Sequence, residues 1–200
     1  MENKFAWIMT PNKPWDDKKE MITTALESGI SYVLDLDDYD KIQKLGNVKI
    51  VANSDDADIY LVGINGEGDG SLILSEDLNQ SQDLQEAKKA KGEGKTVCAY
   101  VEITDKNHEQ LAVSLGSVVD YIILISTDWT VIPLENIIAD LQKADVKIIA
   151  AVADEDGAKL AIETLEHGTD GVIFEANDFN QIKKIAQLVV DASKIKYDLK

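Results

Sequence analysis

The segment DYIILISTDWTVIPLENIIADLQ, residues Asp120–Gln142, decides the fold prediction. It begins with an apolar run, Tyr121–Ile125, continues through the polar tip Ser126–Trp129, and ends in a helical pattern. A strand that is apolar at consecutive positions must be covered on both faces, as parallel strands are. Polar groups at its carboxyl end then face the place where parallel α/β folds bind ligands. The segment therefore predicts a buried parallel strand whose tip is a candidate site.

The same unit repeats along most of the chain. Apolar runs typical of strands lie at Phe5–Thr10, Tyr32–Leu36, Val48–Ala52, Ile59–Ile64, Thr96–Ile103, Val119–Ile125, Val146–Val152 and Gly171–Glu175. Helical patterns lie at Trp15–Ser28, Asp38–Leu45, Asn79–Lys91, Lys106–Leu115, Leu134–Lys143, Glu155–Glu166 and Phe179–Ser193. This alternation predicts a (β/α)8 TIM-barrel-like fold, with the helix between the third and fourth strands missing because residues 53–58 are too few for one. An open doubly wound parallel sheet is the alternative, since barrel closure cannot be read from one sequence.

Composition and charge exclude several classes of protein. The formal net charge is −17, and all 20 basic residues are lysines. Binding to nucleic acid needs clustered cations that neutralise phosphates, so we expect no nucleic-acid partner. No apolar run reaches the roughly 18 residues that cross a bilayer, and residues 1–10 lack signal-peptide organisation, so we expect a cytoplasmic protein without membrane association. Cys98, the single cysteine, lies in an apolar run and is expected in the core.

Polar side chains end most of the predicted strands. They are Thr10, Asp35, Asp37, Asn65, Glu67, Glu102, Thr104, Thr127, Asp128, Asp154 and Glu175. In a barrel the carboxyl ends of the strands meet on one face, so we expect these residues to form a common rim. Glu102 lies within an apolar run, where desolvation would raise its pKa and suit it to acid/base catalysis. Alternatively, it points between barrel and helices and pairs with a lysine. Asp35 follows the same reasoning, whereas Asp37 and Asp38 are typical helix caps.

Few cations or histidines add to this rim. Lys13, after the first strand, is the remaining cation able to reach it. His108 and His167 occupy helical positions that look exposed, which is typical of surface histidines. Clustered carboxylates could hold a divalent metal ion, but no HxH, HExxH or EF-hand spacing is present, so we expect no metal.

The segment Gly63–Gly70, GINGEGDG, is the only glycine-rich stretch. A dinucleotide fingerprint would open directly into a helix, whereas here the apolar, strand-like segment Ser71–Leu74 follows. A flexible loop whose backbone N–H groups approach a phosphate or a polyol is the better interpretation. Trp129, just past a strand tip, could stack on a flat ring or cover the start of a helix.

These segments resemble the archaeal-type 3-dehydroquinate synthase family, also called dehydroquinate synthase II. The resemblance rests on four sequence segments, which together run through most of the chain: FAWIMT, GINGEGDG, VDYIILISTDWTVIPLENIIADLQ and VKIIAAVADEDGAKLAIETLEHGTDGVIFEAND. The resemblance implies an NAD-dependent enzyme of aromatic amino acid biosynthesis. It would deaminate 2-amino-3,7-dideoxy-D-threo-hept-6-ulosonate oxidatively and close the ring by aldol addition to give 3-dehydroquinate, an entry to the shikimate pathway.

The expected site combines this reaction with the rim. Glu102, Asp35 and Asp128 are the candidate catalytic residues, because oxidation needs a neutral amine and a carboxylate can accept its proton. The candidate substrate-binding residues are Thr127, Trp129, Lys13 and Glu175. The candidate cofactor-binding residues are Gly66, Glu67 and Gly68, through the backbone of the glycine loop.

The resemblance also implies a longer polypeptide. Family members continue into a C-terminal β-rich domain, so we expect residues 1–194 to form the barrel and residues 195–200 to begin that domain as a strand. The domain would be a partner within the same polypeptide, and the protein could form oligomers. Two alternatives stay open: a scaffold domain that is inactive alone, and a lyase or isomerase of phosphorylated sugars with phosphate bound near the last two strands.

Overall fold

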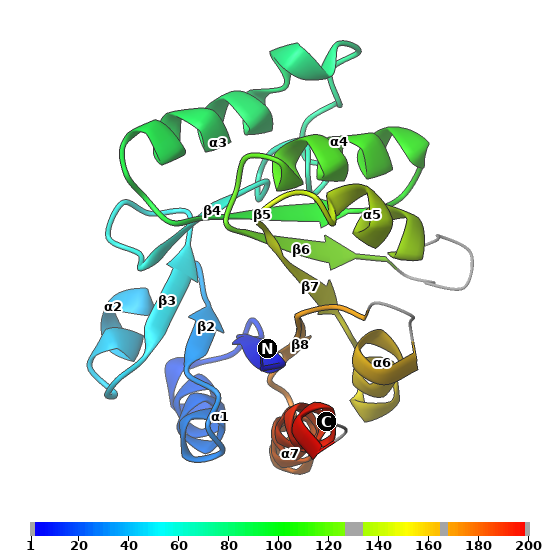
Figure 1. Cartoon of the computed structure of the whole chain (residues 1–200). Coiled ribbons are helices and arrows are strands. Elements are labelled where there is room, and N and C mark those ends of the chain that lie inside the picture. The colour runs from blue at the N-terminus through cyan, green and yellow to red at the C-terminus, as the bar shows by residue number, and fades with distance from the viewer. Residues whose placement is uncertain (1–2, 127–133, 165–167, 199–200) are drawn as a thin grey trace. The chain divides into compact units, whose positions relative to one another are not determined.

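A computed structural model describes residues 3–126, 134–164 and 168–198 (Figure 1). The strands are β1 Phe5–Met9, β2 Tyr32–Leu34, β3 Lys49–Ala52, β4 Ile59–Val62, β5 Val97–Glu102, β6 Tyr121–Ile125, β7 Lys147–Ala151 and β8 Gly171–Glu175. The helices are α1 Trp15–Glu27, α2 Tyr39–Gln43, α3 Gln82–Gly92, α4 Lys106–Gly116, α5 Leu134–Leu141, α6 Glu155–Lys159 and α7 Phe179–Asp198. A 3-10 turn, Leu78–Gln80, precedes α3, and a π-helical turn, Leu160–Thr164, follows α6.

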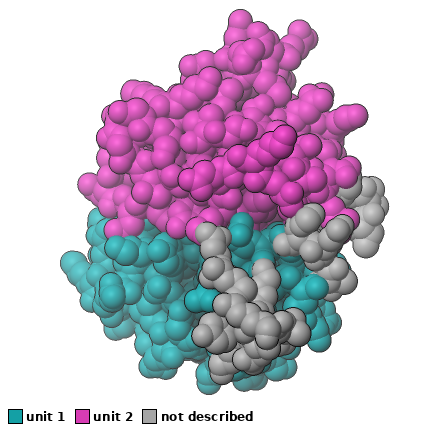
Figure 2. All heavy atoms as spheres, viewed as in Figure 1, with its two compact units in different colours: residues 1–52, 152–200 teal, residues 53–151 magenta. Residues whose placement is uncertain are grey.

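The strand order β1 to β8 is that of a closed parallel barrel, which confirms the predicted (β/α)8 class over the open sheet. Residues 53–58, all of them described, connect β3 to β4 without a helix, also as predicted. The chain divides into two compact units, residues 1–52 with 152–200 and residues 53–151, coloured teal and magenta in Figure 2.

Unit 1 contains β8, β1, β2 and β3, paired in parallel in that order, with α1, α2, α6 and α7. Residue pairs such as Ile8↔Phe174 and Val33↔Ile50 set the register. All four of these side chains are fully buried. The Trp7 ring is also buried and stacks on Tyr32 at a centroid distance of 5.1 Å. Apolar side chains on both faces of these strands explain their unbroken apolar runs.

Unit 2 contains β4, β5, β6 and β7, again in parallel, with α3, α4 and α5. Cys98 pairs with Leu61 and Tyr121 and is fully buried, as the sequence predicts. Burial raises the pKa of its thiol, so Cys98 is a core residue and not a nucleophile. Helix α4 covers β5 and β6 with the apolar stripe that includes Leu111 and Leu115.

The tail differs from its prediction. Helix α7 runs through Asp198, so residues 195–198 continue a helix and do not begin a strand. The polar and apolar alternation of KIKYDLK misled the prediction, because seven residues cannot separate a strand period from the end of a helical one. A further β-rich domain stays a prediction. Of the helices in the described residues, none is long and apolar enough to cross a membrane.

Candidate functional site

The predicted rim residues fall in different parts of the chain. Asp35, Lys13 and Glu175 belong to unit 1, whereas Glu102 and the glycine loop belong to unit 2. Residues Thr127, Asp128 and Trp129 lie outside the described residues. Lys13 and Glu175 are exposed, the latter at the end of β8. That all these residues lie together on one rim stays a prediction.

Asp35 follows β2 and is only 2% exposed. Its carboxylate accepts hydrogen bonds from the Thr10 hydroxyl, from Lys18 Nζ at 2.9 Å, and from the backbone N–H groups of Asp37 at 2.8 Å and Asp38 at 2.6 Å. Burial alone would raise its pKa, but these four donors together hold the pKa below its usual value. A carboxylate so strongly stabilised as an anion is a poor proton acceptor, so this geometry argues against the predicted role of Asp35 as a base.

Lys18 completes this cluster from α1 and is 3% exposed. Its ammonium binds Asp35 and also Asp38, at 2.8 Å. Burial opposes the charge, yet the hydrogen bonds to Asp38 and Asp35 raise its pKa above the usual value. Lys18 is not among the residues predicted from the sequence, where its only signal is its place one turn into the helix after the first strand.

Glu102 is the last residue of β5 and is half-buried, which agrees with its place within an apolar run of the sequence. Its backbone N–H donates to the carbonyl of Gly68 at 2.8 Å, which ties the glycine loop to the tip of the strand. Tyr100 lies two residues earlier and so on the same face of the strand. Burial, together with the charges of Glu102 and Asp69, raises the pKa of Tyr100 to about 12. A neutral phenol and a carboxylate therefore lie together at the carboxyl end of β5.

The backbone of the glycine loop is hydrogen-bonded to two nearby carboxylates, Asp69 in the loop and Asp83 in α3. Asp69 accepts from the N–H groups of Asn65 at 2.7 Å and Gly66 at 3.2 Å, and Asp83 accepts from that of Gly68 at 2.7 Å. The N–H groups of residues 69, 70 and 72 donate to carbonyls within the loop. Most N–H donors of the loop are thus already engaged, several of them with carboxylates that would repel a pyrophosphate. In this conformation the loop does not fit the phosphates of NAD, so the cofactor role of Gly66, Glu67 and Gly68 stays a prediction without support from the geometry.

Two buried acids underlie this loop. Glu67 is 1% exposed and accepts from Ser81 Oγ at 2.6 Å and the Ser75 N–H at 2.8 Å, which outweigh burial and lower its pKa. Asp83 is 2% exposed, and its pKa is raised by burial and by the charge of Glu67. Glu67 thus anchors residues 75–83 to the loop, which is a structural role.

His108 is held by Asp105 at the start of α4. Asp105 caps the helix by accepting from the His108 N–H at 2.8 Å, and the same oxygen lies 2.8 Å from Nδ1 of the ring. Thr104 Oγ1 lies 3.3 Å from Nδ1. The side chain is only 14% exposed, so the expectation of an ordinary surface histidine is wrong. The D-x-x-H spacing across a helix start was the available signal.

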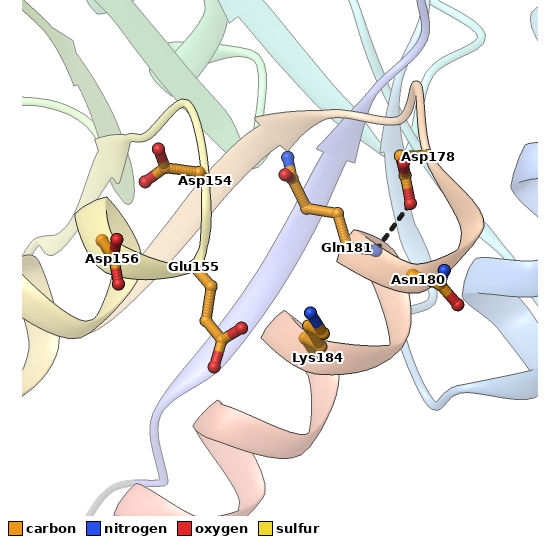
Figure 3. Close-up of a pocket in the computed structure, with 7 residues that line it drawn as sticks. All are labelled: Asp154, Glu155, Asp156, Asp178, Asn180, Gln181 and Lys184. Atoms are coloured by element: carbon orange, nitrogen blue, oxygen red, sulfur yellow. Dashed lines mark hydrogen bonds between the residues drawn. The ribbon is translucent and has the colours of Figure 1, made fainter.

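A polar pocket of about 330 Å³ lies between the starts of α6 and α7 in unit 1 (Figure 3). Its lining residues are Asp154, Glu155, Asp156, Asp178, Asn180, Gln181 and Lys184. Figure 3 shows Glu155 and Lys184 facing the space between the two helices. Asp154 and Asp178 accept the N–H groups of Gly157 at 2.8 Å and Gln181 at 3.0 Å, as helix caps. Of these pocket residues, only Asp154 is among the site residues predicted from the sequence.

This pocket follows β7 and β8 in the chain, where barrels of the phosphate-binding kind hold their anion. Four carboxylates and one lysine line it, so it favours ammonium and hydroxyl groups over phosphate. Across the described residues, no group of three or more His, Cys, Asp or Glu side chains is arranged to hold a metal ion.

Comparison with known proteins shows the family. The profile of the 3-dehydroquinate synthase II N-terminal domain matches residues 3–189. A 3-dehydroquinate synthase of Methanobrevibacter smithii is 99% identical over 192 residues, which are 96% of this chain and 52% of that protein. The enzyme of the same name from Methanothermobacter thermautotrophicus is 55% identical over 98% of this chain and 53% of its own length. The chain thus spans about half the length of these curated relatives.

Solved structures support the fold alone. A phospho-2-dehydro-3-deoxyheptonate aldolase from Thermotoga maritima aligns with a TM-score of 0.65 at 14% identity, covering 97% of this chain and 71% of that one. The (S)-3-O-geranylgeranylglyceryl phosphate synthase of Thermoplasma acidophilum gives a TM-score of 0.60, also at 14% identity, covering 95% and 94%.

Proposed function

The chain belongs to the 3-dehydroquinate synthase II family, and on that premise we propose that it is the first half of an enzyme that converts 2-amino-3,7-dideoxy-D-threo-hept-6-ulosonate to 3-dehydroquinate. The overall reaction is an oxidative deamination followed by an aldol ring closure, with NAD as the oxidant. The observation that carries the proposal is the family match over residues 3–189, together with 99% identity to a named 3-dehydroquinate synthase.

Between the two candidate catalytic carboxylates that the structure describes, Glu102 and Asp35, Glu102 is the better suited to accept the proton of the substrate's ammonium. It is a half-buried carboxylate at a strand tip, and no lysine bonds it within the described residues. The alternative in which it pairs with a lysine therefore has no support here. Asp35, in contrast, is saturated with donors and holds the chain segments around it in place.

The acidic pocket supports an amino-polyol substrate and not a phosphorylated sugar. Its carboxylates could bind an ammonium or hydroxyl groups, while a phosphate would meet four negative charges. The second enzyme hypothesis, a sugar-phosphate lyase or isomerase, therefore lacks the anion site that it needs after the last two strands.

NAD finds no fitting phosphate site among the groups described above. The N–H groups of Gly66 and Gly68 in the glycine loop are already bonded to carboxylates, and the pocket after β8 is acidic. We therefore propose that NAD binding depends on polypeptide outside these 200 residues.

The replacement Glu102→Gln tests the role of this carboxylate. In the longer polypeptide it should lower kcat by about 10²–10⁴-fold, because amide nitrogen and oxygen cannot take up a proton at neutral pH. The measurement is NADH formation from the amino-heptulosonate, with circular dichroism to verify folding.

Glu76→Gln is the matched control, since Glu76 is exposed and distant from the tip of β5 in the chain. It should leave the rate unchanged. A Glu102→Gln enzyme that keeps near-normal turnover removes Glu102 from the mechanism.

A further inference from the structure

The pair His108–Asp105 in unit 2 has the arrangement of an oriented base. Asp105 needs only the backbone N–H of His108 to cap α4, yet its Oδ1 also lies 2.8 Å from the ring Nδ1. Because a carboxylate oxygen only accepts hydrogen bonds, Nδ1 carries the proton at this contact. The lone pair of a neutral ring is then on Nε2.

The ring is placed at the carboxyl end of β5. His108 precedes Leu111, Ala112 and Leu115 by three, four and seven residues, so it continues the buried stripe with which α4 covers β5 and β6. Thr104, two residues past Glu102, contacts Nδ1. Within the described residues Nε2 makes no hydrogen bond, so a half-buried acceptor is left available at the strand tip.

We propose that His108 is a second proton acceptor of the reaction, oriented by Asp105, and that it serves the aldol ring closure. This proposal rests on the proposed function. The substrate has a ketone at carbon 6 beside the deoxy carbon 7. Nε2 takes a proton from carbon 7, whose C–H electron pair becomes the enolate. Carbon 7 then bonds to the acceptor carbonyl carbon, and the alkoxide formed there takes the proton back from the imidazolium.

Asp105 acts as the positioning residue. Its pKa is lowered, first by the hydrogen bond from the His108 N–H and then by the ring, so it is a carboxylate at neutral pH. Its charge stabilises the imidazolium that forms during proton transfer. Other charged or titratable groups at the same ends of the elements around α4 are Tyr100, Glu102, Asp83 and Glu135, with Lys106 and Glu109 on α4 itself.

The test uses solvent exchange at carbon 7, which needs no NAD. The longer polypeptide is incubated with the amino-heptulosonate in D2O without NAD, and loss of the methyl proton signal is followed by NMR. The wild type should speed exchange well above buffer, and His108→Gln should reduce that acceleration by about 10²-fold or more while keeping the cap at the backbone N–H. Glu76→Gln, at an exposed residue that the proposed reaction does not use, should retain it.

Asp105→Asn separates orientation from structure. Asn still caps the helix, but it removes the charge that orients the ring and stabilises the imidazolium, so exchange should slow and the preference of the ring for the Nδ1-protonated tautomer should weaken. The proposal is overturned if His108→Gln exchanges the carbon 7 protons as fast as the wild type does. It is also overturned if the wild type exchanges them no faster than buffer alone. Failure of the proposed function is seen separately, as absence of NADH when NAD is added to a protein that does exchange carbon 7.

The tautomer gives a readout independent of turnover. The chain has two histidines, so ring ¹⁵N spectra contain two imidazoles, and His108→Gln assigns them. We expect a protonated Nδ1 and an unprotonated Nε2 for His108. The opposite tautomer contradicts the orientation that the proposal requires.

Discussion

Single carboxylates in this protein differ in function because their hydrogen-bond donors differ. Asp35 and Glu102 both end strands, yet Asp35 accepts from four donors whereas Glu102 remains half-buried at its strand tip. The first is stabilised as an anion and holds its surroundings together. The second has the Tyr100 phenol as a hydrogen-bond partner and no lysine partner among the described residues, which leaves it the better candidate for proton transfer. Hydrogen bonding to the charged form, not burial alone, therefore decides which strand-end acid can act as a base.

Lys18→Met should destabilise the protein by about 3–5 kcal/mol, because it leaves the buried Asp35 charge without its ammonium partner. Urea unfolding followed by circular dichroism measures the change. Lys19→Met, an exposed neighbour on α1, should stay within about 0.5 kcal/mol of wild type. Equal effects of the two replacements would contradict the role of the pair.

The pH dependence of that difference follows from the two pKa directions. Asp35 has a lowered pKa, so its contribution is present above its unfolded pKa of about 4 and is lost as pH falls through the folded value. Lys18 has a raised pKa, so its contribution is present below about 10.5 and is lost as pH rises through the folded value. The stability gap between wild type and Lys18→Met should therefore be widest between these limits.

Among the elements, the glycine loop is the most constrained by its neighbours. A Cβ at Gly68 would collide with the carbonyl oxygen of Tyr100, and one at Gly66 with the carboxylate of Asp83. The glycines thus serve close packing of the loop against β5 and α3, with the loop donors bound to Asp69 and Asp83. The sequence suggests that the glycine loop binds a ligand. In the structure, the loop instead packs on the end of β5 and is held by hydrogen bonds to nearby carboxylates.

Gly68→Ala should lower the free energy of unfolding by about 1–3 kcal/mol, since the backbone of β5 cannot yield to the added methyl group. Chemical denaturation measures it. Gly92→Ala at the end of α3 is the matched control, because its Cβ would meet no atom within 4 Å. It should be neutral or slightly stabilising. A neutral Gly68→Ala would mean that the loop is not packed on Tyr100.

For the whole molecule, two observations bear on activity. The chain spans about half the length of its relatives, and neither the glycine loop nor the acidic pocket fits the phosphates of NAD. Both agree with the proposal that this barrel domain supplies acid/base groups to a longer polypeptide. The net charge of −17 is consistent with this proposal, because a negatively charged protein attracts an ammonium group and repels the phosphates of a dinucleotide.

The 200-residue chain should therefore bind NAD at least about tenfold more weakly than the longer polypeptide and produce no measurable NADH from the amino-heptulosonate. Isothermal titration of both proteins with NAD, alongside the NADH assay, measures this. Equal NAD affinity of the two proteins would place the cofactor site within these 200 residues. It would contradict the proposal that NAD binding depends on the rest of the polypeptide.

The sequence by itself determined the class of fold, the eight strands and the missing helix between β3 and β4, because apolar runs and turn lengths are local properties. It also placed Cys98 in the core and Glu102 at a strand tip. Only the tertiary structure decided which of the candidate groups are free. The partners of Asp35 and Gly68 come from Lys18 and Asp83, 17 and 15 residues away, and hydrogen bonds between such distant groups depend on how the elements pack.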